Sequence, residues 1–312
     1  MKNTGVLVKT NGLSRAEWLE WRRKGIGGSD VSILFGVNPF KSINQLWLEK
    51  TGQIDLGETN SEAAYFGSEL ESFVKREFTR RTGMKVRVKH TILQSEEHPF
   101  MLADLDGVIN LDGEICIFEA KTASAYKKDA WEKGVPFEYI LQAQHYMAVT
   151  GAKRAFISAL VGGNSFYIRE VLRDEVLIAK IIAMEKDFWE NHVLTVIEPL
   201  PDGSSASTSF INARFSESNG NCIELPPETL ELFSRFDEVS SELEKLNATK
   251  DQICNQLKFY LKENEEGYVG NRRISWKQIE TNRFDKKRFE MENPDAYQKY
   301  LTKSHYRRML VA

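Results

Sequence analysis

The sequence has few of the features that mark secreted, disulfide-bonded or zinc-stabilised proteins. Its 312 residues include three cysteines, an odd number at wide spacings, which disfavours a disulfide framework and favours a reducing compartment. Three cysteines also exclude an iron–sulfur cluster held by four thiolates of one chain. The five histidines form no His-x-x-x-His pattern, and Cys-x-x-Cys is absent, so a structural zinc site has no support.

Long apolar runs are lacking as well. No stretch reaches the ~18 apolar residues that would predict a membrane span. The first residues have neither the hydrophobic segment nor the cleavage site of a secretion signal, so we expect a cytoplasmic protein with no membrane partner. The net charge of −3 says little about nucleic acid, because DNA responds to local fields, and several short basic clusters permit phosphate contacts.

Hydrophobic periodicity predicts an alternation of helices and strands. Helices are expected over 15–24, 42–52, 67–83, 137–150 and 173–194, and strands over 85–93, 101–109, 114–120, 154–161 and 165–171. Asp112-Gly113 and Gly162-Gly163 favour hairpin turns between successive strands. Residues 53–62 are polar and predict a loop. The order of elements indicates the α/β (or α+β) class, with a central mixed β-sheet flanked by helices.

The composition changes after residue 198. Residues 199–221 are rich in Pro, Gly, Ser and Asn, which is typical of a linker or surface loop. We therefore place a core domain at 1–198, a linker or surface loop at 199–225 and a C-terminal helical extension at 226–312. Apolar residues at heptad-like spacing over 228–264 predict a long helix or helical pair, packed on the core or against another subunit.

Charged residues on two of the predicted strands are the candidates for chemistry. Glu119 and Lys121 share one face of the 114–120 strand, because strand side chains alternate. Burying an acid and a base on an apolar strand is costly, although for this pair alone a salt bridge at a strand end is the commoner explanation. With Asp106 of the neighbouring strand, two carboxylates beside a lysine make an oxygen-rich site suited to Mg²⁺. The lysine can orient water or stabilise charge on a phosphate.

A third carboxylate is available on the 67–83 helix. Glu71 follows Gly67 by four residues, so the two lie on one helix face, and Gly67 would allow close approach of a backbone or of the substrate. Glu69 is the local alternative. Taken alone, Glu71 is better explained as a solvent-facing helix acid.

The order of these motifs resembles a known nuclease family. Asp106 and Glu119-Ala120-Lys121 match the short core motif of PD-(D/E)xK nucleases. Three further motifs come in the order seen in lambda-exonuclease-like, YqaJ-type viral recombinases: Trp18-x-x-x-Arg22 with Ser29, Gly67-x-x-x-Glu71, and Gln142-x-Gln144-His145-Tyr146-Met147. The C-terminal Arg283-Phe284-Asp285 and Tyr306-Arg307-Arg308 are similar to the tail of this family. The likeness covers residues 14–195 well and the rest more loosely.

The resemblance implies a restriction-endonuclease-like core and a role for each motif residue. Metal ligands would be Glu71, Asp106, Glu119 and the backbone carbonyl of Ala120, and Lys121 would activate the attacking water. Arg22 and Ser29 would hold the 5′-phosphate of a DNA end, while Gln144 would contact the region of the scissile phosphate. Asp104 departs from the pattern, since lambda exonuclease has a hydroxyl residue at that position. Here a phosphate contact is lost or an acidic group gained.

By the same resemblance, the activity would be Mg²⁺-dependent 5′→3′ exonuclease digestion of linear double-stranded DNA. It would leave 3′ single-stranded overhangs for phage-type homologous recombination. Two Mg²⁺ ions are implied, with Mn²⁺ able to substitute. The implied partners are double-stranded DNA ends, two further copies in a ring-shaped trimer, and a single-strand annealing protein. The source would be a phage or prophage acting in the cytoplasm of a bacterial host.

Two other functions use the same residues. A PD-(D/E)xK endonuclease would share the core motif, and only its action on closed circular DNA would distinguish it. A non-catalytic DNA-binding scaffold would have no reason to retain Glu71, Asp106, Glu119 and Lys121 together. The nucleases that carry an iron–sulfur cluster are disfavoured by the cysteine count.

Overall fold

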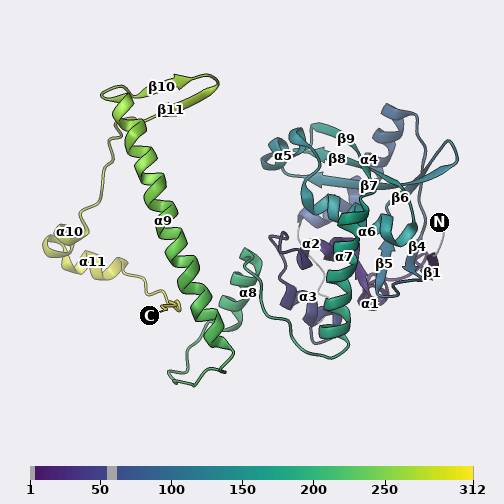
Figure 1. Cartoon of the computed structure of the whole chain (residues 1–312), viewed down its shortest axis with the longest axis horizontal. Helices are drawn as coiled ribbons and strands as arrows, with labels where there is room; N and C mark the ends of the chain where they lie inside the picture. Colours follow the sequence, from purple (N-terminus) through teal and green to yellow (C-terminus); the bar gives the residue numbers. More distant parts are fainter. Residues whose placement is uncertain (1–3, 55–61, 312) are drawn as a thin grey trace. The chain divides into compact units, whose positions relative to one another are not determined.

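The computed structural model describes residues 4–54 and 62–311, so most of the loop predicted over 53–62 lies outside the described residues. The chain forms two compact units, residues 1–214 and 215–312, which are considered separately. The first unit contains two β-sheets and most of the helices, and the second is built around one long helix (Figure 1).

The larger sheet of the first unit has the strand order β3-β6-β7-β8-β9. These strands are β3 Val86–Arg87, β6 Gly107–Leu111, β7 Glu114–Ala123, β8 Arg154–Val161 and β9 Ser165–Leu172. β7 and β8 run parallel, whereas β6 and β7, and β8 and β9, are antiparallel neighbours. The sheet is therefore mixed, as the sequence predicts.

A smaller sheet has the order β1-β4-β5-β2. Its strands are β1 Thr4–Lys9, β4 Thr91–Ser95, β5 Met101–Asp104 and β2 Ile26–Gly27. The helices of the first unit are α1 Arg15–Arg23, α2 Gly28–Leu34, α3 Ile43–Lys50, α4 Glu62–Thr82, α5 Lys128–Lys133, α6 Phe137–Thr150, α7 Glu175–Asp187 and α8 Ser205–Arg214. A 3₁₀ turn, Ala125–Lys127, precedes α5, and a π-helical turn, Phe188–Val193, follows α7. Together with the mixed sheet, this arrangement confirms the α/β class.

Helices cover both faces of the larger sheet. Val74 and Phe78 of α4 pack with Phe118 of β7 on one face, where the rings of Phe78 and Phe118 lie 4.9 Å apart. On the other face, Ile117 of β7 belongs to the cluster that contains Leu141 of α6. Burial of each apolar side chain of this size contributes about 1.5–3 kcal/mol to folding, which fixes Ile117 toward α6 and Phe118 toward α4. Because side chains alternate along a strand, Glu119 lies on the same face of β7 as Ile117.

Two of the predicted strands are each broken in the structure. The expected strand 101–109 divides into β5 and β6, which belong to different sheets, and the expected strand 85–93 divides into β3 and β4 in the same way. Asp106 therefore lies in the crossing between the sheets rather than at the end of a hairpin strand. Its Oδ2 accepts a hydrogen bond from the Ala120 backbone N–H at 2.8 Å, which ties the crossing to β7.

The expected linker or surface loop at 199–225 is wrong in part, because it contains α8, which belongs to the first unit. Asp202 Oδ1 accepts hydrogen bonds from the Ser204 N–H and the Ser207 hydroxyl at the start of this helix. Ala206 and Ser207 are buried. The serines whose composition suggested a loop thus lie at the start of a helix, where they bond to Asp202 or are buried. The first unit therefore extends to Arg214.

The second unit contains α9 Thr229–Leu261, a single helix of 33 residues, as one of the two sequence-based alternatives predicts. A hairpin of β10 Glu266–Val269 and β11 Arg272–Ser275 follows, and then α10 Lys286–Glu292 and α11 Pro294–Tyr300. Within the described residues, no helix combines the length and the apolar character needed to cross a membrane.

Candidate active site

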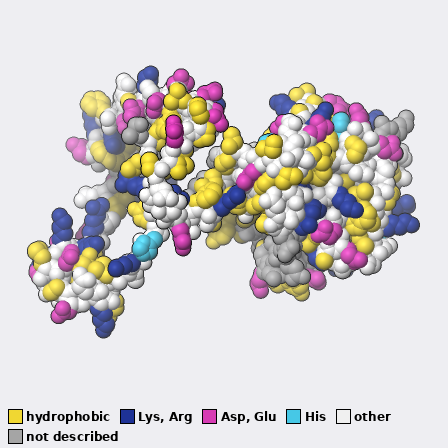
Figure 2. Space-filling model, turned by 90° about the horizontal axis from the view of Figure 1, so that it is seen from below, with side chains coloured by type: hydrophobic (Ala, Val, Ile, Leu, Met, Phe, Trp, Pro, Cys, Tyr) yellow, Lys and Arg dark blue, Asp and Glu magenta, His cyan; other side chains and the backbone are white. Residues whose placement is uncertain are grey.

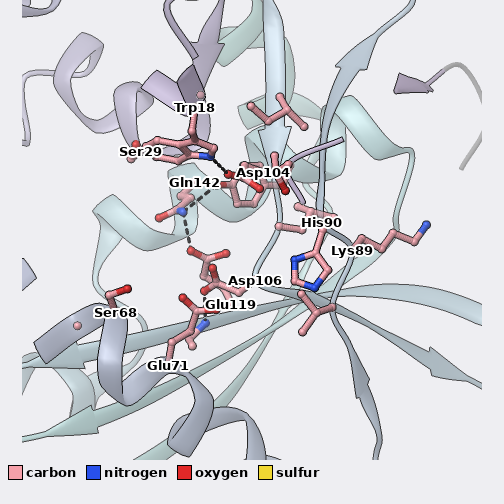
Figure 3. Close-up of a pocket in the computed structure, with 18 of the residues that line it drawn as sticks. Trp18, Ser29, Ser68, Glu71, Lys89, His90, Asp104, Asp106, Glu119 and Gln142 are labelled. Atoms are coloured by element: carbon pink, nitrogen blue, oxygen red, sulfur yellow. Dashed lines mark hydrogen bonds between the residues drawn. The ribbon is translucent and has the colours of Figure 1, made fainter. Parts of the chain in front are cut away.

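A pocket of about 650 Å³ in the first unit gathers most of the residues singled out in the sequence (Figure 3). Its lining includes the carboxylates of Glu71 on α4, Asp106 in the crossing between sheets, and Glu119 on β7. The same lining includes Ala120, Lys121, Arg22 and Ser29. Side chains that are up to about a hundred residues apart in the sequence therefore meet in one pocket.

Glu119 and Lys121 form the central ion pair of the pocket. Lys121 Nζ lies 2.7 Å from Glu119 Oε1 and donates a second hydrogen bond to Gln142 Oε1 at 2.9 Å. The Gln142 amide in turn donates to Glu119 Oε1 at 2.6 Å and contacts the Tyr146 hydroxyl at 3.1 Å. Both polar ends of Gln142 thus hold the ion pair in place from α6.

Burial dominates the electrostatics at the floor of this pocket. It raises the pKa of Asp106 well above the usual value, and the nearby Glu119 carboxylate raises it further. Burial also raises the pKa of Glu119, against the opposing effect of Lys121. For Lys121, burial acts to lower the pKa, but the Glu119 and Asp106 carboxylates outweigh it and the net shift is upward. Burial therefore opposes ionisation of both carboxyl groups at the pocket floor, and Lys121 offsets only part of this effect.

The residues of this floor fit a divalent metal ion by donor chemistry. Within the described residues, no three His, Cys, Asp or Glu side chains form a ready-made metal cluster. Glu119 Oε2, however, is buried with no hydrogen-bond partner, and a buried carboxylate oxygen of this kind is costly to leave unsatisfied. Glu71 currently pairs with Lys75 one turn along α4. Hard carboxylate oxygens with one oxygen unpartnered are the ligands that Mg²⁺ and Mn²⁺ prefer.

Arg22 and Ser29 form a second group on the wall of the pocket. The Arg22 guanidinium donates to the Ser29 hydroxyl at 2.9 Å and lies 3.8 Å from the Asp30 carboxylate. Asp30 also receives Lys50 Nζ at 2.8 Å. Although burial opposes it, the charges of Lys50 and then Arg22 lower the pKa of Asp30 far below its usual value. α1, α2 and α3 are thereby joined through one buried carboxylate.

Trp18 supports Arg22 from the other side. Its indole N–H donates to Asp104 Oδ2 at 2.7 Å (Figure 3), and its ring lies 4.1 Å from the Arg15 guanidinium and 4.8 Å from that of Arg22. Burial raises the pKa of Asp104, against the Trp18 hydrogen bond. The acidic residue that departs from the family pattern therefore positions an aromatic ring beneath two arginines.

The assignment of Gln144 to the substrate site is wrong. Its amide N–H donates to the Leu172 carbonyl at 2.7 Å, its Oε1 accepts from the Asp174 N–H at 2.9 Å, and its side chain is 2% exposed. Two residues along an α-helix are separated by about 200°, so Gln142 and Gln144 point to opposite sides of α6. Gln142 lines the pocket instead. The pairing of Gln142 with Tyr146 at helical spacing was the sequence signal that could have identified it.

Gly67 lines the pocket, and close approach of the substrate there stays a prediction. Within the described residues a Cβ on Gly67 would meet Thr122 Oγ1 at 3.5 Å, an ordinary contact, so no neighbouring backbone among them requires glycine at this position. At Gly28, by contrast, a Cβ would lie 2.6 Å from the Tyr146 ring and 2.9 Å from Gln142 Cγ. Gly28 thus lets the start of α2 rest directly on the face of α6 that carries the pocket residues.

A buried ion pair that sequence reasoning missed lies behind the pocket. His145 Nδ1 is 2.6 Å from Glu185 Oε1 and its Nε2 is 2.8 Å from the Leu102 carbonyl oxygen, with both side chains fully buried. Burial acts to lower the pKa of His145, but Glu185 and then the Leu102 carbonyl outweigh it and the net shift is upward. α6 is held between α7 and β5 by this pair.

Comparisons with known proteins agree with the motif order. A family model described as the YqaJ-like viral recombinase domain matches residues 17–153. A protein of Bacillus subtilis (strain 168) described as "Uncharacterized protein YqaJ" is 42% identical over 311 residues, which is 98% of this chain and 97% of that protein.

Some solved structures overlap with part of the chain. An alkaline exonuclease from Laribacter hongkongensis is 21% identical with a TM-score of 0.46, over 58% of this chain and 94% of that one. Its complex with dAMP is 21% identical with a TM-score of 0.48, over 64% and 97%. A phage related exonuclease from Haemophilus somnus 129PT is 14% identical with a TM-score of 0.44, over 55% and 96%.

Proposed function

Because the chain belongs to the YqaJ-like viral recombinase family, we propose that its pocket is the active site of a DNA exonuclease. One observation carries the proposal: Glu71 of α4, Asp106 from the crossing between the sheets, and Glu119 with Lys121 of β7 converge in a single pocket. Arg15, Arg22, Lys75 and Lys89 line the same pocket, so acidic groups share it with basic groups that can contact phosphates. A single salt bridge at a strand end would need neither the additional carboxylates nor the basic lining.

The chain's own residues have distinct roles in this proposal. Lys121, held by Glu119 and Gln142, presents an ammonium group that orients the attacking water and donates to a phosphate oxygen. Asp106, Glu119 and Glu71, with the Ala120 carbonyl, would hold divalent metal. When bound there, Mg²⁺ supplies an acidified water and neutralises charge on the phosphate. We propose two ions, with Mn²⁺ able to replace Mg²⁺.

The finer activity that we propose is 5′→3′ digestion of linear double-stranded DNA, which leaves 3′ overhangs for recombination. Arg22 and Ser29 support it, because a guanidinium and a hydroxyl on the pocket wall suit a terminal 5′-phosphate. The ring-shaped trimer, the annealing-protein partner and a phage or prophage protein acting in the host cytoplasm are proposed from the family resemblance alone.

The test is digestion of a duplex labelled at the 5′ end of one strand in one sample and at the 3′ end in another, with Mg²⁺. We expect rapid release of the 5′ label as a short product, with the 3′ label retained in shortening strands. Lys121→Ala and Asp106→Asn are expected to abolish both signals, and Glu69→Gln serves as the matched control on α4. Efficient cleavage of covalently closed circles would replace the exonuclease proposal with an endonuclease. Full activity of Lys121→Ala would refute the site assignment.

A further inference from the structure

Within the described residues of the C-terminal unit, α9 carries an apolar stripe that the rest of this unit leaves exposed. Along α9, apolar side chains recur at alternating intervals of four and three residues, with one interval of seven between Leu246 and Ile253. They are Leu232, Phe236, Val239, Leu243, Leu246, Ile253, Leu257 and Tyr260. All of them are exposed, with Leu243 at 57% and Leu246 at 67%. Hydrophobic side chains are visible on the surface of this unit in Figure 2. Exposed apolar residues that share one helical line mark an interaction surface rather than a solvated face.

The spacing identifies the kind of surface. Alternating steps of four and three residues are the a and d positions of a heptad repeat, and the repeat runs from Leu232 to Tyr260 with Lys250 as its one polar position. At 1.5 Å per residue the stripe is about 42 Å long, enough for about four heptads of knobs-into-holes packing. A helix that docks in a groove of a globular protein is usually shorter or has a wider apolar face. A line of a and d positions instead fits another helix of the same length.

Lys250 lies four residues after Leu246 and three before Ile253, so it occupies the heptad position between them. If two copies of α9 paired in parallel and in register, Lys250 would face Lys250 of the partner subunit within the apolar seam. Like charges placed together in a low-dielectric seam destabilise it. An antiparallel pair avoids this contact, because a residue at an a position then lies in a layer with a residue at a d position.

The charges along α9 favour the same orientation. Residues 229–245 contain five acidic and two basic side chains, whereas residues 246–261 contain two lysines and one aspartate. A parallel pair would set the acidic half against itself, while an antiparallel pair sets it against the more basic half. Opposed helix dipoles add to the preference, since the positive end of one helix lies near the negative end of the other.

We propose that α9 pairs with α9 of a second copy of this chain as an antiparallel coiled coil. The full-length antiparallel register places Leu243 against Leu246 of the partner subunit at the centre. Phe236 meets Ile253 of the partner subunit and Leu232 meets Leu257 of the partner subunit. Lys250 faces Val239 of the partner subunit, where its long stem packs and its ammonium reaches solvent. This interface is independent of the nuclease site.

The first test is the mass of the full-length protein by light scattering after size exclusion. Leu243→Glu combined with Leu246→Glu is expected to lower the mass about twofold relative to wild type, because two charges would enter the centre of the seam. The matched control, Ser241→Glu with Ala248→Glu, places the same charges on the opposite side of α9 and is expected to keep the wild-type mass. A seam variant with wild-type mass and wild-type helix content would overturn the proposal.

A second test reads the orientation without disturbing the fold. In a background of Cys222→Ser and Cys254→Ser, Leu232→Cys and Leu257→Cys are introduced into separate, differently tagged full-length chains. After co-expression and mild oxidation, we expect a disulfide between the two kinds of chain and none within either kind alone. Disulfides within each kind would show parallel pairing. The absence of any disulfide would show that another surface, such as the chain's own first unit or a different protein, covers the stripe; either result overturns the proposal.

Discussion

At the scale of single residues, the pocket contains the proposed catalytic groups and the side chains that hold them in place. Glu119 and Lys121 could be identified from the sequence because an acid and a base on an apolar strand stand out. Gln144 was misassigned since the QxQ motif offers two amides, and the choice depends on which side of α6 faces the pocket. Asp104 and His145 gave no usable signal, because their partners Trp18 and Glu185 are distant in the sequence.

Substitutions of the two glutamines of α6 should have opposite consequences. Gln142→Ala removes the amide that holds Glu119 and Lys121, so we expect a large loss of cleavage rate with little change in stability. Gln144→Ala leaves the Leu172 carbonyl and the Asp174 N–H buried without their partner, which should cost about 1–3 kcal/mol of unfolding free energy with cleavage retained. Urea unfolding and turnover of a labelled duplex, measured on both variants, separate the two effects. The reverse pattern would return Gln144 to the site.

Arg22 should determine the preference for phosphorylated DNA ends. Loss of a charge-assisted hydrogen bond costs about 1.5–3 kcal/mol, so Arg22→Ala should reduce the rate ratio of 5′-phosphorylated to 5′-hydroxyl duplex roughly ten- to a hundredfold. Metal binding should be unchanged, because Arg22 contacts Ser29 and Asp30 rather than the carboxylate floor. Arg23→Ala, on the neighbouring residue that pairs with Glu20, is the matched control. An unchanged end preference in Arg22→Ala would contradict the assignment.

At the scale of elements, the local signals predicted helices better than strands. The helices expected over 15–24 and 137–150 agree with α1 and α6, because helix signals such as the capping box that the structure shows at Ser14 and Glu17 lie within a few residues of one another. The strands expected at 85–93 and 101–109 were each divided between two sheets. Alternation shows that a segment is extended, but the partner strand is chosen by contacts far away in the sequence. The crossing at Asp106 is a consequence of that choice.

The tie between α1, α2 and α3 through Asp30 should make stability depend on pH. The pKa of Asp30 is lowered in the folded chain from 3.8, so its contribution is present above pH 3.8 and is lost as pH falls from there toward the lower folded pKa. Asp30→Asn breaks a buried pair with Lys50, which should cost about 3–5 kcal/mol at pH 7. The difference from wild type should shrink below pH 3.8 in urea unfolding at several pH values. A difference that stays constant down to pH 2 would show that folding does not lower the pKa of Asp30.

At the scale of the whole molecule, the chain combines a compact α/β unit with a second unit whose long helix exposes its apolar seam. The heptad spacing of α9 could be recognised in the sequence, whereas the boundary between the two units could not. Polar composition alone placed the boundary at 198, but α8 continues the first unit to Arg214 because capping and burial decide where it ends. The two proposals thereby place catalysis in the first unit and self-association in the second.

The carboxylate floor should cost the first unit stability until metal binds. Burial and the neighbouring Glu119 raise the pKa of Asp106, so above its ordinary pKa its preference to ionise opposes folding, and Asp106→Asn should raise the unfolding temperature of metal-free protein at neutral pH. In wild type, Mg²⁺ at a hundredfold excess over its dissociation constant should stabilise by about 2.7 kcal/mol, and in Asp106→Asn most of that gain should disappear.

Thermal melts of wild type and Asp106→Asn, each with EDTA and with Mg²⁺, measure both effects in one experiment. Glu69→Gln is the control for loss of a carboxylate nearby on α4, and it should respond to Mg²⁺ as wild type does. If the carboxylate floor binds metal, Asp106→Asn should raise the unfolding temperature measured in EDTA. The same substitution should reduce the increase in unfolding temperature that Mg²⁺ causes. Equal Mg²⁺ stabilisation of wild type and Asp106→Asn would remove Asp106 from the metal ligands, because a ligand's loss must lower the affinity on which the stabilisation depends.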